Sequence, residues 1–155
     1  MPGRPYAYDV PVANTLRDTQ DLADDARQLL AEIDRDVPGA ARISADCRPP
    51  IDVFETVNGL EVVVDVPGVP ADSLRVAVRR STLLIVGAKL TTTPESARYH
   101  MAERSYGRFA RAVRLTGAFD AARARAATSG GQLRVTLPRL EERRGRVMRI
   151  PVERE

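Results

Sequence analysis

The sequence predicts an all-β protein, an antiparallel β-sandwich that follows an amphipathic helical arm and precedes a charged C-terminal extension. Through residues 60–137, apolar side chains recur at every second position in short runs separated by turns, which is typical of such sandwiches. Residues 14–36 show the three-and-four spacing of a helix instead. We therefore expect an N-terminal arm over residues 1–47, a β-domain over 48–139 and an extension over 140–155.

The length and composition limit the class of protein. A chain of 155 residues has room for one domain of about 90–110 residues plus tails. No apolar run approaches the roughly 18 residues that span a bilayer, and the N-terminal residues do not show the apolar h-region of a signal peptide. The single cysteine, Cys47, excludes an internal disulfide framework. We predict a cytoplasmic protein without stable membrane insertion.

The charges are divided unevenly along the chain. Residues 1–46 carry five Arg against nine acidic residues, a net charge of −4, and the remainder carries 19 basic against 12 acidic residues, a net charge of +7. This asymmetry predicts different roles for the arm and the domain. Arg and aromatic residues alternate in "RSYGRFARAVR", but an ordinary strand explains that run better. We expect no nucleic-acid partner.

The arm carries one apolar stripe. Pro38 and Gly39 end the predicted helix, and acidic residues cover its other faces. Such a stripe must be buried, either on the chain's own domain or, slightly favoured here, against other copies in an oligomer. The stripe consists of Leu16, Leu22, Ala26, Leu29, Leu30 and Ile33.

The β-domain shows successive runs of period two. The turn "PGVPADS" separates the first two runs, Gly87 ends a continuous apolar run, "TLLIVGA", and Pro138 ends the last. The alternating apolar positions are Leu60, Val62, Val64 and Val66, then Leu74, Val76 and Val78, then Phe109, Val113 and Leu115, then Leu133, Val135 and Leu137. A polar segment over residues 89–108 interrupts the series, and its "YHMAER" is able to pair as a strand at a neighbouring sheet edge.

Residues for catalysis are not apparent in the sequence. It contains no GxxxxGK[ST] phosphate loop, and "SGG" before a strand indicates a turn. His100 has no second ligand at metal-binding spacing, and Cys47 precedes "RPP" as a linker thiol would. We predict a protein that is not an enzyme and needs neither cofactor nor metal.

Several blocks, in this order and spacing, resemble the alpha-crystallin domain of bacterial and plant small heat-shock proteins. They are "IDVFETVNGLEVVVDVPGV", "LLIVGAK", "YHMAERSYGRFARAVRL" and "GGQLRVTLPR", covering about residues 49–139, and the terminal "IPV" matches that family's I-x-I/V motif. The resemblance implies an immunoglobulin-like sandwich of seven or eight strands.

The resemblance also implies dimers that exchange the loop strand. "RYHMAER", with Tyr99, His100 and Met101, would pair with the partner's edge strand near Ile51 and Val53. The family's dimer ion pair falls on Glu103 and Arg111. The alternative for Arg111 is a side chain that extends to the sandwich rim without a carboxylate partner.

The terminal motif, formed by Ile150, Pro151 and Val152, is implied to dock in a groove of a neighbouring dimer. The groove lies between two edge strands that map to residues 74–79 and 123–128. Alternation predicts that Val76 and Val78 form one wall, and Ala124 and Ala126 the other. The small alanines predict a wide or shallow groove.

The resemblance implies an ATP-independent holdase chaperone of the stress response, a homo-oligomer built from dimers that binds unfolding client proteins. The arm departs from the family's pattern, because its only aromatic residues are Tyr6 and Tyr8. A structural module of the same fold that scaffolds one specific partner is therefore the alternative. The client-binding candidates are Leu16, Leu22, Leu29, Leu30 and Ile33.

Overall fold

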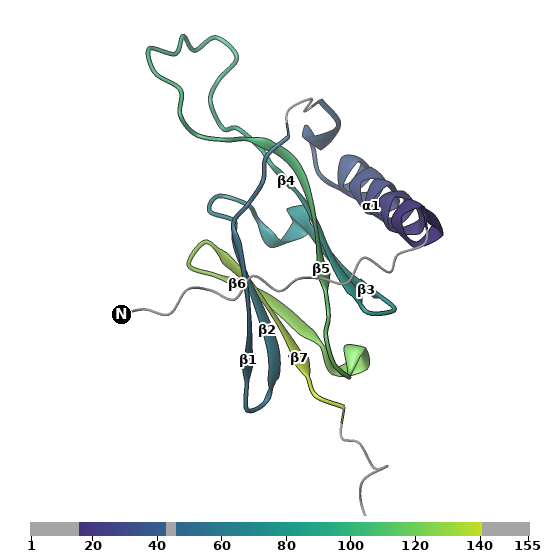
Figure 1. Ribbon diagram of the computed structural model, residues 1–155. Helices are drawn as coiled ribbons and strands as arrows, with labels where there is room; N and C mark the ends of the chain where they lie inside the picture. The colour runs from purple at the N-terminus through teal and green to yellow at the C-terminus, as the bar shows by residue number, and fades with distance from the viewer. Residues whose placement is uncertain (1–15, 43–45, 141–155) are drawn as a thin grey trace, which may run out of the picture.

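Two antiparallel sheets form a β-sandwich, and one helix lies against the outside of the smaller sheet (Figure 1). The computed structural model describes residues 16–42 and 46–140. The four-stranded sheet has the order β1-β2-β7-β6, with β1 Ile51–Thr56, β2 Gly59–Asp65, β7 Gln132–Pro138 and β6 Arg125–Ser129. The three-stranded sheet has the order β3-β4-β5, with β3 Leu74–Arg79, β4 Thr82–Lys89 and β5 Gly107–Arg114. The predicted sandwich is confirmed.

The core between the sheets is made by the alternating side chains. In the four-stranded sheet, Val62 of β2 lies opposite Val135 of β7, and both are buried. In the other sheet, Leu83 and Ile85 of β4 supply the inward side chains. Because successive side chains of a strand point to opposite faces, the period-two pattern places one apolar set between the sheets.

Strand β4 is buried on both of its faces. Leu83 and Ile85 belong to the sandwich core, whereas Leu84, Val86 and Ala88 belong to a second apolar cluster. A strand that is covered on both sides shows a continuous apolar run in place of alternation. This explains "TLLIVGA".

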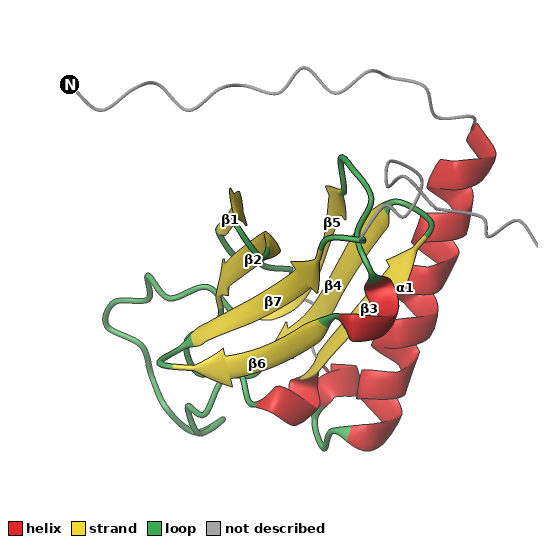
Figure 2. Ribbon diagram, turned by 90° about the horizontal axis from the view of Figure 1, so that it is seen from below, coloured by secondary structure: helices red, strands yellow, loops and turns green. Residues whose placement is uncertain are grey.

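The cover on the outer face of β4 is α1, Leu16–Asp36 (Figure 2). Ile33 is 1% exposed and packs with Val37 and Ala40 against the outward side chains of β4. Gly39, with a φ of +84°, turns the chain beyond the helix, as the sequence predicts. The part of the stripe formed by Ala26, Leu29, Leu30 and Ile33 therefore packs on the chain's own domain. Packing against other copies, which we slightly favoured, is wrong for the described stripe, because β4 offers a second apolar face.

Ion pairs surround the apolar contact of α1 with the sheet. Asp36 pairs with Arg75 of β3 at 3.0 Å, and Asp25 pairs with Arg79 of β3 at 2.7 Å. Asp34 pairs with Arg108 of β5. Acidic residues of the arm thus pair with basic residues of the domain within one protomer. Each partly exposed pair contributes about 0.2–1 kcal/mol.

Strand β6 starts later than we predicted. Residues 121–123 form the 3-10 helix η3, Ala121–Arg123, and the strand begins at Arg125. The Asp120 side chain accepts a hydrogen bond of 3.0 Å from the Ala122 N–H, which satisfies an amide at the start of this turn. Ala124 therefore precedes the strand.

Candidate functional site

The predicted tail-binding groove maps to the edge strands β3 and β6. Each is the last strand of its sheet, so within the described residues one side of its backbone has no ladder partner. Val76, Val78 and Ala124 are half-buried and pack against the sandwich core, whereas Ala126 is exposed. The structure thus brings Val76, Val78 and Ala124 to the same apolar layer and leaves Ala126 outside it.

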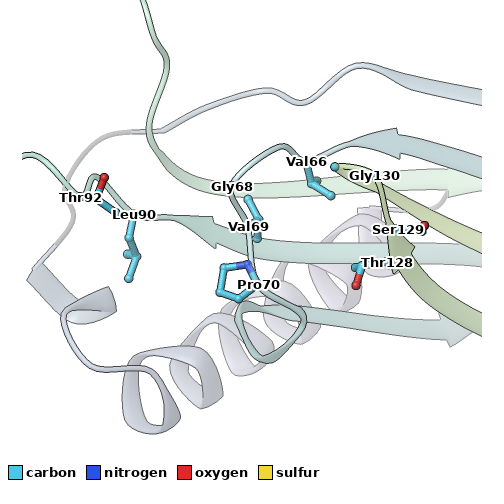
Figure 3. A pocket seen from close by; sticks show the side chains of 10 residues that line it. Val66, Gly68, Val69, Pro70, Leu90, Thr92, Thr128, Ser129 and Gly130 are labelled. Carbon is cyan, nitrogen blue, oxygen red and sulfur yellow. The ribbon is translucent and has the colours of Figure 1, made fainter.

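A hollow adjoins one end of these strands (Figure 3). It lies where β6 ends at Thr128 and Ser129 and where the turn before β3 places Val69 and Pro70. None of the side chains that line it is charged. They belong to Val66, Val69, Pro70, Leu90, Thr92, Thr128 and Ser129, and Gly68, Gly130 and Gly131 complete the lining. The edges of β3 and β6 therefore adjoin an uncharged surface.

Strand β1 forms the opposite edge of the four-stranded sheet and carries exposed apolar side chains. Val53 and Phe54 are 43% and 42% exposed, and Ile51 is half-buried against the core. An apolar edge strand with unpaired backbone groups is a surface on which another strand can add. The register Val53↔Val62 leaves the other side of β1 open in the described protomer.

The segment that the resemblance assigns to strand exchange is a long loop between β4 and β5. It extends away from the sandwich (Figure 1) and contains no strand within the described residues. Met101 is 76% exposed, and Tyr99, His100 and Glu103 are exposed as well. Large apolar side chains on such a loop are available to a partner copy.

Arg111 lies on the core-facing side of β5, opposite Ile85 of β4. Its guanidinium donates a 2.6 Å hydrogen bond to the Pro49 carbonyl oxygen. Burial, and then the positive charge of Arg48, lowers the pKa of Arg111. Within the described part of the protomer, no salt bridge joins it to Glu103. A carboxylate from outside the protomer would therefore stabilise the charged form.

Cys47 lies where the chain runs beside β5, and its own backbone N–H donates to the Arg108 carbonyl at 2.9 Å. Its thiol donates to the Gly107 carbonyl oxygen at 3.4 Å. Burial raises the pKa of Cys47, so the reactive thiolate is disfavoured. Among the described residues, no three His, Cys, Asp or Glu side chains gather as metal ligands, and no helix has the length and apolar character of a membrane span.

The client-binding candidates on the arm are all residues of α1. Ile33 is buried, whereas Leu22, Leu29 and Leu30 are half-buried. Leu16 begins the helix, but its side chain is outside the described residues, as are Ile150, Pro151 and Val152. In this state Ile33 is unavailable to a client.

Sequence reasoning missed the outer face of β4 and its charged rim. Leu84 and Val86 contact the helix, and Arg75, Arg79 and Arg108 hold its carboxylates. Two signals were present. The run in β4 did not alternate, and the acidic residues of the arm matched the basic residues of the domain in sign.

Known proteins resemble the chain over most of its length. Residues 52–153 match the model of the Hsp20/alpha crystallin family. Small heat shock protein C2 of Rickettsia felis is 30% identical over 106 residues, which cover 68% of this chain and 68% of that protein. The match spans 63% of the length of small heat shock protein C4 of Rickettsia felis and 56% of the length of the 22.0 kDa heat shock protein of Arabidopsis thaliana.

Solved structures show the same fold. Heat shock protein 16.0 of Schizosaccharomyces pombe superposes with a TM-score of 0.59 at 29% identity, covering 70% of this chain and all of that one. A small heat-shock protein of Xylella fastidiosa gives a TM-score of 0.62 at 27% identity, covering 71% of this chain and all of that one. With its two antiparallel sheets, its edge strands and this match over two thirds of its length, the chain belongs to the Hsp20/alpha crystallin family of small heat-shock proteins.

Proposed function

We propose that the protein is an ATP-independent holdase, which binds unfolding proteins and prevents their aggregation. The observation that carries this proposal is the presence of apolar edges that are left open in the protomer, on β1, on the loop before β5 and between β3 and β6. The sequence contains no GxxxxGK[ST] phosphate loop that would bind a nucleotide. Such a protein holds apolar segments by reversible burial, and it works without catalysis.

The holdase assembles from dimers in this proposal. Tyr99, His100 and Met101 of one protomer add to the edge of β1 near Ile51 and Val53 of its partner. The exposed Met101 and Val53 support this pairing, because their burial would remove apolar surface from water. The related Xylella fastidiosa protein has a distinct high order structure, which favours assembly here as well.

The C-terminal extension links the dimers. Ile150 and Val152, with Pro151 between them, insert between β3 of a neighbouring copy, at Val76 and Val78, and β6, at Ala124 and Ala126. The half-buried valines support this assignment, because they present apolar surface beside an open strand edge. In this assembly the arm is formed by residues 1–47, the dimerising domain by residues 48–139, and the linker between dimers by residues 140–155.

An aggregation assay tests the holdase. The full chain, at equimolar subunit concentration and without ATP, is expected to suppress light scattering by a heat-unfolded test enzyme to less than about half, because burial of apolar segments removes them from association. An inert globular protein at the same concentration is the control. Unchanged scattering would contradict the holdase. One stoichiometric partner in a pull-down would then favour the scaffolding module, which the aromatic-poor arm permits.

The dimer contact gives a further prediction. Arg111→Glu is expected to raise the dimer dissociation constant about tenfold or more, because it opposes the carboxylate of the partner's Glu103. The exchanged pair, Glu103→Arg with Arg111→Glu, is expected to recover most of this loss. Mass photometry or sedimentation of dilute protein measures both. If Glu103→Arg alone has no effect and the exchange restores nothing, Arg111 is a rim residue without this partner.

A further inference from the structure

The face of the β3-β4-β5 sheet that α1 covers is an apolar surface with a cationic rim. We call it the outer sheet face and define it by Leu84, Val86 and Ala88 of β4, with Arg75 and Arg79 of β3 and Arg108 of β5 at its margin. The three apolar residues are at most 4% exposed under the helix. Without α1, a row of aliphatic side chains would face water.

The sandwich core is separate from this cover. Its core cluster and the cluster beneath α1 share no residue, because the side chains of β4 divide between the two faces of the sheet. No residue of α1 belongs to a strand ladder, so displacement of the helix breaks no hydrogen bond between strands. Removal of α1 therefore exposes the outer sheet face and leaves the two sheets paired.

The ion pairs that hold α1 are partly open to solvent. The side chains of Arg79 and Asp25 are 42% and 29% exposed, and those of Arg75 and Asp36 are 23% and 48% exposed. Pairs of this kind are screened by salt and contribute little individually. The contact thus combines a dry apolar centre with a margin that water and ions reach.

We propose that the outer sheet face is a binding surface for apolar segments of unfolding chains, and that α1 is its resident occupant. The helix defines the chemistry that the surface accepts, namely aliphatic side chains in the centre, such as Ile33, with carboxylates at the margin. An occupant of this class takes the place of α1 when heat or salt releases the helix. This inference rests on the proposed holdase function, which supplies the unfolding chain.

A client segment is a stronger competitor than the helix of a second copy. The resident helix is tethered to its own sheet, so its effective concentration exceeds that of an identical helix on another molecule. A second α1 offers the same contacts and has no advantage in affinity. An unfolding chain offers several apolar segments at once, so their number allows it to compete with α1 for the outer sheet face.

Thiol labelling tests the release of the helix. In a Cys47→Ser background, Val86→Cys places the only thiol beneath α1, and Val62→Cys places it in the sandwich core, since both valines are fully buried. Asp25→Arg sets a second guanidinium beside Arg79. The matched control is Asp24→Arg, which changes the net charge equally but alters an exposed pair with Arg27 within the helix.

Asp25→Arg is expected to raise the labelling rate of the Val86→Cys thiol about fivefold or more, the factor that roughly 1 kcal/mol of lost docking produces. Asp24→Arg is expected to leave that rate within about twofold. The Val62→Cys thiol is expected to stay unreactive in all backgrounds. Equal acceleration at both thiols would mean global unfolding, and no acceleration would mean that α1 is not releasable. Either result overturns the proposal.

The occupant is tested in the Asp25→Arg variant that carries Val86→Cys. A synthetic peptide with the sequence of residues 16–36, which lacks cysteine, is expected to slow labelling about fivefold at saturation. A scrambled peptide of equal composition is the control and is expected to have no effect. A cysteine-free protein unfolded by heat is expected to slow labelling as the first peptide does.

The outcomes separate this inference from the holdase itself. Suppressed aggregation with unchanged labelling in the presence of unfolded protein would place clients elsewhere and overturn the inference alone. Failure to suppress aggregation would contradict the proposed function, and the peptide arm would still decide whether the surface binds such a segment. Protection that rises with the concentration of the variant alone would identify a second copy as the occupant and overturn the client assignment.

Discussion

Ile150→Ala with Val152→Ala is expected to reduce the native assembly to dimers. Burial of each side chain is worth roughly 1.5–3 kcal/mol, so one docked tail contributes at best about −4 to −5 kcal/mol after ordering costs, a dissociation constant near millimolar. Such a contact is effective only when several tails act together in a closed assembly. Because alanine removes most of the buried area from every tail at once, the loss of mass is expected to be complete.

Native mass measurement of the full chain beside the double variant checks this result. Val147→Ala is the matched control, since it shortens an aliphatic side chain of the same extension at an odd spacing from Ile150, which points away in an extended segment. The control is expected to keep the parent mass. An unchanged mass for the double variant would show that the extension does not build the assembly.

Gly59→Ala is expected to lower the free energy of unfolding by about 3–5 kcal/mol, through backbone strain and overpacking together. Gly59 has a φ of +146° and begins β2 directly opposite Pro138 of β7. An added Cβ would overlap the Leu137 carbonyl oxygen and lie 2.9 Å from the Pro138 Cα. These are backbone atoms of the central strand pair, so relief requires the strands to separate.

The thermal midpoint at fixed protein concentration measures this effect and is expected to fall by more than about 10 °C. Gly39→Ala separates strain from steric overlap, because Gly39 also has a positive φ, of +84°, but nothing lies within 4 Å of its added Cβ. Its cost is expected to be about 1 kcal/mol. Equal shifts in both variants would show that the close approach of β2 to β7 is not the cause.

The sequence alone was sufficient for the strands of the sandwich and for the end of the helix. Alternation at residues 60–64 and 133–137 predicted two strands, because a strand with one buried face alternates apolar and polar side chains. Pro38 and Gly39 marked the end of α1, since their restrictions on the backbone act locally. The start of β6 was misplaced, because a single capping side chain, Asp120, decided it.

Sequence reasoning could place Val76, Val78 and Arg111 on strands, but it could not predict what surrounds these side chains. Val76 and Val78 were expected on an edge strand, and the structure puts them there, half-buried. The hydrogen bond of Arg111 to the Pro49 carbonyl joins residues 62 positions apart. No local pattern specifies such a contact, since it depends on where the linker crosses between the sheets.

What the sequence determined by itself is the set of local elements, because dihedral preferences and side-chain periods act over a few residues. Only the tertiary structure decided which surface buries the stripe of α1. The sequence shows that the helix has an apolar face. It allows two packing partners for that face, the chain's own sheet or another copy of the protein. The second face of β4, with arginines at the correct positions around it, selects the first. That choice is a match between two distant surfaces, which neither segment specifies without the other.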